Sequence, residues 1–342
     1  MAEPLPLIVI TGFLGAGKST LLNHLLKQPA LAGTAVLINE FGEVGLDHLL
    51  VERLDDTTVL LNAGCLCCTV RGDLVQALRD LQPRVESGQV RRVVVETTGL
   101  ADPAPILQTL MGDPFAATHY RLDGVVTVVD AMHAMAQLDR QPEAVKQVAI
   151  ADRLVLTKTD LVDAAPVRAR LAALNPAAPI LVADHGRVDP ALLLAAGFDP
   201  ASRGADVQAW LKVDAYSGHA HHDHNKHGHD PNRHDASIRA FCMVFERPLH
   251  WQGVGTWLEM LIATQGDKLL RVKGILNLEG QDRPVAIHGV QHLFHPPALM
   301  AEWPDGDPRT SRIVMIVRDI DPGVIERGLR AFEEAAGVSV SE

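Results

Sequence analysis

Residues 12–19 combine three glycines with a lysine and a serine in the pattern G-x-x-x-x-G-K-[ST]. Backbone N–H groups of such a loop can surround phosphate oxygens, while Lys18 would reach the β- and γ-phosphates and Ser19 would bind Mg²⁺. The motif follows an apolar run at residues 7–11 and opens a stretch with helical spacing of leucines. We therefore predict a phosphate site. A ligand-free glycine turn is the alternative, but it needs neither Lys18 nor Ser19. The glycines are Gly12, Gly15 and Gly17.

An acidic residue, Glu96, ends the apolar run 93–95, and Gly99 follows it. A carboxylate at the end of a strand can hold Mg²⁺ directly or through water, and the glycine would let the next segment respond to the γ-phosphate. The alternative is a solvated glutamate without a role. The phosphate motif elsewhere in the chain favours the functional interpretation, so Lys18, Ser19 and Glu96 form the predicted catalytic set.

The segment 157–160 reads T-K-T-D and follows an apolar run at residues 153–156. The Asp160 carboxylate can accept two hydrogen bonds from guanine, an arrangement of donors that adenine does not offer, and the Lys158 stem can lie along the base. Thr157, Lys158 and Asp160 are therefore predicted to bind GTP in preference to ATP.

Three of the four cysteines, Cys65, Cys67 and Cys68, occur within four residues. Thiolates bind Zn²⁺, Cu⁺ or Co²⁺ much better than Mg²⁺. A closed structural zinc site needs four protein ligands, and the sequence has no second C-x-x-C pair. We expect an exchangeable site completed by water, a histidine, another protein or a carboxylate such as Glu43, although Glu43 could instead face the nucleotide magnesium. A cluster of small buried residues and a redox pair are the alternatives.

Seven histidines lie between residues 219 and 234, among polar residues, glycine and proline. Such a segment buries too little apolar surface to fold alone, so residues 216–236 are predicted to be a flexible linker. The tract is either a low-affinity store for metals such as Zn²⁺ or Co²⁺, or a solvated spacer; we favour metal binding. The candidate ligands are His221, His222 and His224.

Short apolar runs alternate with stretches of helical spacing through the first two hundred residues. This alternation predicts an α/β domain over residues 1–215, a P-loop NTPase domain with a mostly parallel sheet. After the histidine tract, apolar runs return together with two helical stretches, and they predict a small α+β domain over residues 237–342. The runs lie at residues 7–11, 35–38, 93–95, 125–129, 154–157 and 180–182, then at 240–245, 269–278, 285–289 and 313–317, with helices at 254–264 and 324–335.

The composition of the chain excludes some classes of partner and indicates a cellular location. A net charge of -11 and a pI near 5.8 argue against nucleic acid or an anionic membrane as the main partner. Apolar runs are too short for a signal peptide or a membrane span, and the few clustered cysteines indicate reduced thiols and a cytoplasmic location. Self-association into a homo-oligomer is left open.

Taken in order, the segments GFLGAGKST, NEFGEVGLD, GCLCC, VVETTGLADP and TKTD resemble the CobW/YjiA-type family of P-loop GTPases, over essentially the whole chain. The resemblance implies phosphate binding by Gly12 to Thr20, Ala16 included. It also implies metal binding by the three clustered cysteines, Glu96 as the acid of the second nucleotide motif, and residues 157–160 as the guanine reader.

The resemblance further implies slow GTP hydrolysis and delivery of zinc to a metal-requiring client protein. Cobalt handling in cobalamin synthesis, a P-loop kinase or transferase, and a metal-dependent regulator with a structural nucleotide are the alternatives. Because the cysteines lie in sequence between the residues 39–47 and Glu96, we expect metal occupancy and nucleotide state to be coupled.

Overall fold

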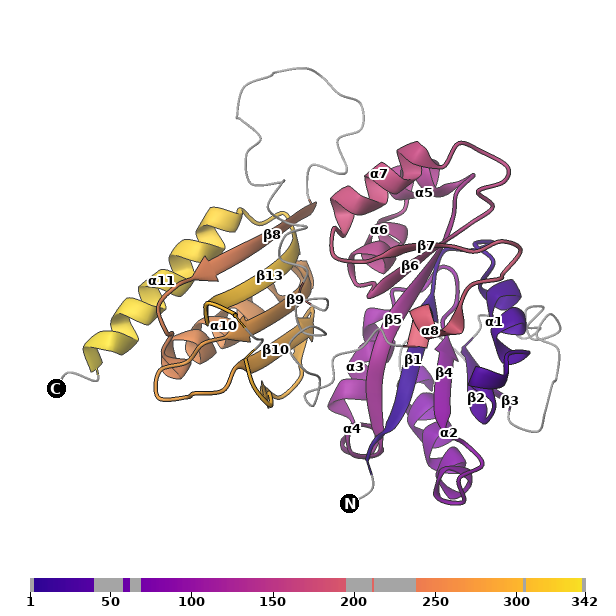
Figure 1. Ribbon diagram of the computed structural model, residues 1–342, viewed down its shortest axis with the longest axis horizontal. Coiled ribbons are helices and arrows are strands. Elements are labelled where there is room, and N and C mark those ends of the chain that lie inside the picture. Colours follow the sequence, from indigo (N-terminus) through magenta and orange to yellow (C-terminus); the bar gives the residue numbers. More distant parts are fainter. Residues whose placement is uncertain are drawn as a thin grey trace. The chain divides into compact units, whose positions relative to one another are not determined.

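The computed structural model describes residues 3–39, 58–61, 69–194, 211, 238–303 and 306–339. The chain divides into two compact units, one of residues 1–172 with 178–197 and one of residues 173–177 with 198–342 (Figure 1). The predicted linker and the domain boundaries beside it, at 215 and 237, lie outside the described residues and stay predictions. Within the described ranges, no helix is both long and apolar enough to cross a membrane.

The first unit is built on a parallel sheet. Seven of its described strands follow the order β3-β2-β4-β1-β5-β6-β7, and every neighbouring pair is parallel. Near-continuous apolar runs suit such strands because both faces of the sheet are covered. The predicted P-loop NTPase type of fold is confirmed. The strands are β1 (Leu5–Thr11), β2 (Thr34–Asn39), β3 (Thr58–Leu61), β4 (Arg92–Glu96), β5 (Tyr120–Asp130), β6 (Arg153–Thr157) and β7 (Ile180–Val182).

Helices cover both faces of this sheet. On one face, leucines of α1 and α8 pack against alternate residues of the strands, such as Ile8 and Val126. On the other face, the Thr127 hydroxyl donates to the Gln147 carbonyl of α6, 2.6 Å away, and α3 and α4 contact β5. The helices are α1 (Lys18–Leu26), α2 (Thr69–Glu86), α3 (Ala104–Gly112), α4 (Pro114–His119), α5 (Ala134–Arg140), α6 (Pro142–Ala149), α7 (Ala165–Leu174) and α8 (Pro190–Leu194).

In its described residues, the second unit consists mainly of an antiparallel sheet and the helices α10 and α11. Its described strands follow the order β11-β10-β9-β13-β8, with β12 paired to β10. Residues of α10 and α11, among them Trp257 and Leu329, pack on one face of the sheet. The predicted α+β character is confirmed. The elements are β8 (Ile238–Phe245), α10 (Trp251–Gln265), β9 (Leu269–Leu276), β10 (Val285–Val290), β11 (Leu293–Phe294), β12 (Ala298–Leu299), β13 (Ser311–Arg318) and α11 (Pro322–Ser339).

The fourth cysteine, Cys242, belongs to β8 of this second unit. It packs against a second apolar cluster that includes Ile275 and Val314. Burial raises the pKa of the Cys242 thiol to about 11. Cys242 is therefore a protonated thiol at neutral pH and a poor metal ligand compared with a thiolate.

Candidate nucleotide site at the carboxyl edge of the parallel sheet

The strand order places the predicted nucleotide motifs together. The chain adds β2, β3 and β4 on one side of β1 and then β5, β6 and β7 on the other. In open parallel sheets, ligands bind beyond the carboxyl ends of the strands where the order reverses. The residues that follow or end β1, β4, β5 and β6 meet at this edge, and they include Gly12, Glu96, Asp130 and Thr157.

The phosphate loop between β1 and α1 depends on Gly12. This residue has a φ of 142°, and a Cβ atom on it would lie 2.2 Å from the Val128 carbonyl oxygen of the neighbouring strand. Only glycine fits there. Helix α1 then begins at Lys18 without a side-chain cap. Its first N–H groups, together with the positive end of the helix dipole, are suited to a phosphate group.

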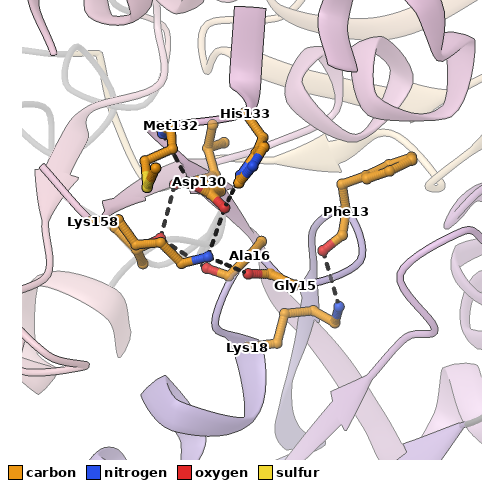
Figure 2. Close-up of polar contacts among 10 residues, drawn as sticks. Phe13, Gly15, Ala16, Lys18, Asp130, Met132, His133 and Lys158 are labelled. Atoms are coloured by element: carbon orange, nitrogen blue, oxygen red, sulfur yellow. Dashed lines mark hydrogen bonds and ion pairs between the residues drawn. The ribbon is translucent and has the colours of Figure 1, made fainter. Parts of the chain in front are cut away.

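Lys18 is held inside this loop. Its side-chain amine donates to the Gly12 carbonyl at 2.9 Å. It also donates to the Phe13 carbonyl at 3.4 Å (Figure 2). The residue is buried. An anion stabilises a buried ammonium, so a phosphate in the loop would be attracted to Lys18.

Ser19, in the first turn of α1, and Glu96, at the end of β4, face each other. The Ser19 hydroxyl lies 3.4 Å from Glu96 Oε1, and Glu96 is only 3% exposed at the end of β4. Hydroxyl and carboxylate oxygens are hard ligands, and Mg²⁺ prefers them. The pair therefore fits the magnesium ion that accompanies a nucleotide.

The segment 97–102, which follows Glu96, packs directly on the phosphate loop. A Cβ atom on Gly99 would lie 2.6 Å from the Cα atom of Leu14, so Gly99 is needed for this close approach. The buried Gln147 side chain donates to the Gly99 carbonyl at 3.4 Å and to the Ala101 carbonyl at 3.1 Å. Helix α6 thus holds the segment that lies between Glu96 and α3.

The predicted base-binding segment is bonded to the phosphate loop on its other side. The buried Thr157 hydroxyl donates to the Ala16 carbonyl at 2.8 Å. The Lys158 amine donates to the Gly15 carbonyl at 2.9 Å (Figure 2). Asp160 is exposed beyond them. The structure therefore brings together Thr157, Lys158 and the loop residues that the sequence predicted.

Asp130 and Gln147 were missed by the sequence prediction. Asp130 ends β5, and its carboxylate lies 2.7 Å from the Lys158 amine and 2.8 Å from His133 Nδ1 (Figure 2). The strand-end rule that identified Glu96 applies equally to Asp130, which directly follows the apolar run 125–129. No comparable signal marks Gln147, because its contacts depend on tertiary packing.

The ligands predicted for zinc, unlike Ser19 and Glu96, fall outside this geometry. Cys65, Cys67, Cys68 and Glu43 lie outside the described residues, and so do His221, His222 and His224. In the ranges that the structure does describe, no group of three or more His, Cys, Asp or Glu side chains could hold a metal ion. The proposed cysteine site and histidine tract therefore stay predictions.

Known proteins resemble the chain along nearly its whole length. The zinc chaperone YjiA of Escherichia coli is 34% identical over 321 residues, which cover 92% of this chain and 94% of YjiA. The zinc chaperone CobW of Pseudomonas aeruginosa is 31% identical over 361 residues, or 95% of this chain and 91% of CobW. The crystal structure of Zn(II)-bound YjiA GTPase from E. coli has a TM-score of 0.70 at 30% identity, covering 97% of this chain and 99% of YjiA.

The two units also match family models separately. Residues 6–182 match the nucleotide-binding domain of CobW/HypB/UreG, and residues 238–333 match the C-terminal domain of the cobalamin synthesis protein CobW. These matches confirm the predicted family and the predicted GTPase class. The chain belongs to the CobW/HypB/UreG family of P-loop GTPases.

Proposed function

We propose that this protein binds zinc at a thiolate site containing Cys65, Cys67 and Cys68 and transfers it to a metal-requiring client protein in step with its GTP cycle. Hydrolysis converts GTP and water to GDP and phosphate, and zinc is the cargo. Reduced thiols are required for uptake, so we expect the protein to work in the cytoplasm.

The observation that carries this proposal is the strand order β3-β2-β4-β1. Residues 62–68, which contain the cysteines, connect β3 to α2, and β3 is separated only by β2 from β4, which ends at Glu96. Neighbouring strands lie about 4.8 Å apart, so the chain leaves β3 toward the cysteines about 10 Å from the end of β4. A movement near the nucleotide therefore has a short path to the strand that precedes the cysteines.

The similar proteins support zinc as the cargo. Two relatives that align with at least nine-tenths of this chain are named zinc chaperones, and the YjiA crystal structure is described as Zn(II)-bound. Co²⁺ is the alternative cargo because the same thiolates bind it. Glu43 is our candidate for a further ligand of the cysteine site, and the histidine tract is our candidate for a separate low-affinity store.

In the nucleotide site, the loop N–H groups and Lys18 would bind the β- and γ-phosphates, and Ser19 and Glu96 would hold Mg²⁺. When bound, the ion would neutralise part of the negative charge of the phosphates while the γ-phosphoryl group is transferred to water. Asp160 would accept hydrogen bonds from the guanine base. A kinase or transferase is disfavoured because the base-binding segment is of the guanine type and is bonded to the phosphate loop.

The segment 97–102 would transmit the nucleotide state. Gly99 lies against Leu14 of the phosphate loop, and Glu96 at its start faces Ser19. A γ-phosphate beside the loop would favour one position of this segment over another. In the sheet, β2 lies between β4 and β3, the strand that precedes the cysteines. The coupling is reciprocal: if GTP raises the affinity for zinc, zinc raises the affinity for GTP by the same factor.

The test is a competition titration of zinc against a chelator, with GDP and with a non-hydrolysable GTP analogue. We expect the zinc affinity to differ between the two nucleotides by about tenfold, a coupling of ordinary size. A Cys65→Ser, Cys67→Ser, Cys68→Ser variant should lose the high-affinity site. Zinc affinity that depends neither on nucleotide nor on these cysteines would refute the proposal.

Two controls sharpen this titration. Cys242→Ser removes the remaining cysteine, whose partly buried thiol is protonated at neutral pH, and it should leave zinc affinity unchanged. Lys18→Ala removes the amine that would bind the nucleotide phosphates. It should abolish the dependence of zinc affinity on nucleotide while keeping zinc binding itself. If both control variants lost zinc binding, misfolding would explain the loss. Loss of zinc binding in the triple cysteine variant would then not be evidence for the thiolate site.

A further inference from the structure

The carboxylate of Asp130 is buried at the end of β5 and has three hydrogen-bond partners. One oxygen accepts from the backbone N–H of Met132 at 2.9 Å, and the other lies 2.7 Å from the Lys158 amine and 2.8 Å from His133 Nδ1. The side chain is 2% exposed. Burial alone would raise the pKa of Asp130, but hydrogen bonds from Lys158, His133 and Met132 lower it overall, so the group is charged at neutral pH.

Lys158 is the partner that links Asp130 to the nucleotide site. Its backbone has a φ of 57°, which is uncommon for a residue other than glycine. Its amine bridges the Asp130 carboxylate and the Gly15 carbonyl of the phosphate loop, which turns the side chain back across that loop (Figure 2). The stem remains partly exposed, with 36% of the side chain accessible, so it keeps a surface on which a base can lie.

We propose that Asp130 is a positioning residue for guanine-nucleotide binding, which fixes Lys158 across the phosphate loop and thereby presets the base-binding segment 157–160. The proposal rests on the guanine-nucleotide function proposed above. Asp130 touches neither phosphate-binding Lys18 nor the Ser19–Glu96 pair in any described contact, so it acts on binding of the base rather than on hydrolysis. A lysine that is held before the nucleotide arrives loses less conformational entropy on binding.

His133 completes the arrangement from the solvent side. Its side chain is 60% exposed, whereas that of Asp130 is 2% exposed, so the imidazole lies over the carboxylate rather than between it and Lys158. Because the imidazole itself is exposed, its bond with Asp130 is weakened by water and contributes less than the bond from Lys158. We therefore assign the positioning role to the Asp130–Lys158 pair, and His133 provides a neighbouring variant that should have little effect.

The test begins with Asp130→Asn, which keeps the size of the side chain and an oxygen for the Met132 N–H. The new amide N–H₂ group then faces the Lys158 amine, so two donors meet where an ion pair existed. We expect the Kd for GDP, measured by calorimetry, to rise about tenfold, as for the loss of a hydrogen bond to a charged group. ADP binding should be unchanged, KM for GTP should rise and kcat should stay the same.

A double-mutant cycle distinguishes positioning from general stabilisation. If Asp130 acts through Lys158, then Asp130→Asn combined with Lys158→Ala should bind GDP no more weakly than Lys158→Ala alone. Additive effects would overturn the proposal. Asp130→Ser, which presents no amide donor to Lys158, provides a second variant if Asp130→Asn folds poorly, and it should show the same non-additivity.

Two controls define the outcome. Asp139→Asn removes another aspartate of the same unit from its ion pair with Arg170, 2.8 Å away, and His133→Ala removes the exposed contact; both should keep the parent GDP affinity. Unchanged GDP affinity in Asp130→Asn, with normal binding by the parent, would overturn the positioning role alone. A parent protein that does not bind GDP would overturn the guanine-nucleotide function and the positioning role with it.

Discussion

The two sides of the nucleotide site are built differently. The base side, formed by Asp130, Thr157 and Lys158, is joined to the phosphate loop by hydrogen bonds of 2.8 and 2.9 Å, and within it Lys158 is bonded to Asp130 at 2.7 Å. On the phosphate side, formed by Ser19, Glu96 and the segment 97–102, short bonds hold the ends of the segment, from the Thr97 hydroxyl to the Thr11 hydroxyl at 2.8 Å and from the Lys146 amine to the Asp102 carboxylate at 2.6 Å, but the contacts at Ser19 and Gly99 are longer. The Ser19–Glu96 distance is 3.4 Å, and Gln147 lies 3.4 Å from the Gly99 carbonyl.

This difference indicates that one side of the site binds the nucleotide and the other side changes with the nucleotide state. Hydrogen bonds between oxygen atoms are usually 2.5–3.0 Å long and weaken as they lengthen. The base side is therefore suited to holding GTP and GDP alike, whereas the Ser19–Glu96 pair and Gly99 can rearrange when the γ-phosphate leaves. β4 lies beside β2, and β2 lies beside β3, the strand that leads to the cysteines. The part of the site that would respond to the γ-phosphate is therefore also the part nearer to β3.

The strongest test of this division is Gly99→Ala. The added methyl carbon would lie 2.6 Å from backbone atoms of Leu14, so the segment 97–102 or the phosphate loop must shift. We expect kcat for GTP to fall by at least about tenfold, or about 1.4 kcal/mol in activation free energy, because the shift disturbs the Glu96 side of the site. GDP affinity should change less, since the base side is intact.

A glycine in open space provides the control. Gly72 lies in α2 with no heavy atom within 4 Å of its ideal Cβ position, so Gly72→Ala should leave turnover unchanged. It should stabilise the helix by about 0.5–1 kcal/mol, since alanine favours helices. If Gly99→Ala weakened GDP binding as strongly as it lowered kcat, the two sides would not be separable.

Much of the fold and of the site was predictable because both rest on local patterns. The buried run 93–95 predicted a strand, and β4 extends it by one residue at each end, to Arg92 and Glu96. The G-x-x-x-x-G-K-S loop predicted the start of α1, because glycine geometry and helix dipole act within a few residues. The T-K-T-D segment was predictable in the same way, because it begins where the apolar run of β6 ends.

Other features depend on contacts between distant segments, which a single sequence does not display. Gln147 reads as an ordinary polar residue of a helix, yet it is fully buried against Gly99. Asp130 could have been recognised at the end of its strand, but not its bond to Lys158, 28 residues later.

A smaller effect is expected from Gln147→Leu, which changes the anchor of the segment 97–102. Leucine keeps the apolar bulk but leaves the Gly99 and Ala101 carbonyls without the amide donor. We expect kcat to fall about fivefold, equivalent to about 1 kcal/mol, because the segment is held less well beside the phosphate loop. Hydrogen exchange of residues 97–102 should quicken, and GDP affinity should stay near that of the parent.

Gln76→Leu is the matched control for this change. Gln76 lies on α2, and its amide donates to the exposed Asp80 carboxylate at 2.8 Å. Replacing it should alter neither kcat nor exchange in the segment 97–102, because exposed contacts contribute little. Unchanged exchange and kcat in Gln147→Leu would show that α6 does not hold the segment.

The smallest effect is expected on the base side from Thr157→Val. Valine keeps the β-branched shape of threonine, but it removes the hydroxyl that donates to the Ala16 carbonyl at 2.8 Å and the Val129 carbonyl at 3.2 Å. GDP affinity should weaken about three- to fivefold, or about 0.7–1 kcal/mol, with kcat unchanged. Thr118→Val removes a comparable 2.7 Å bond to Pro114 on the exposed side of α4 and should do neither. A fall in kcat without loss of affinity in Thr157→Val would place this residue on the switching side and contradict the division, because its hydroxyl would then matter to hydrolysis rather than to binding.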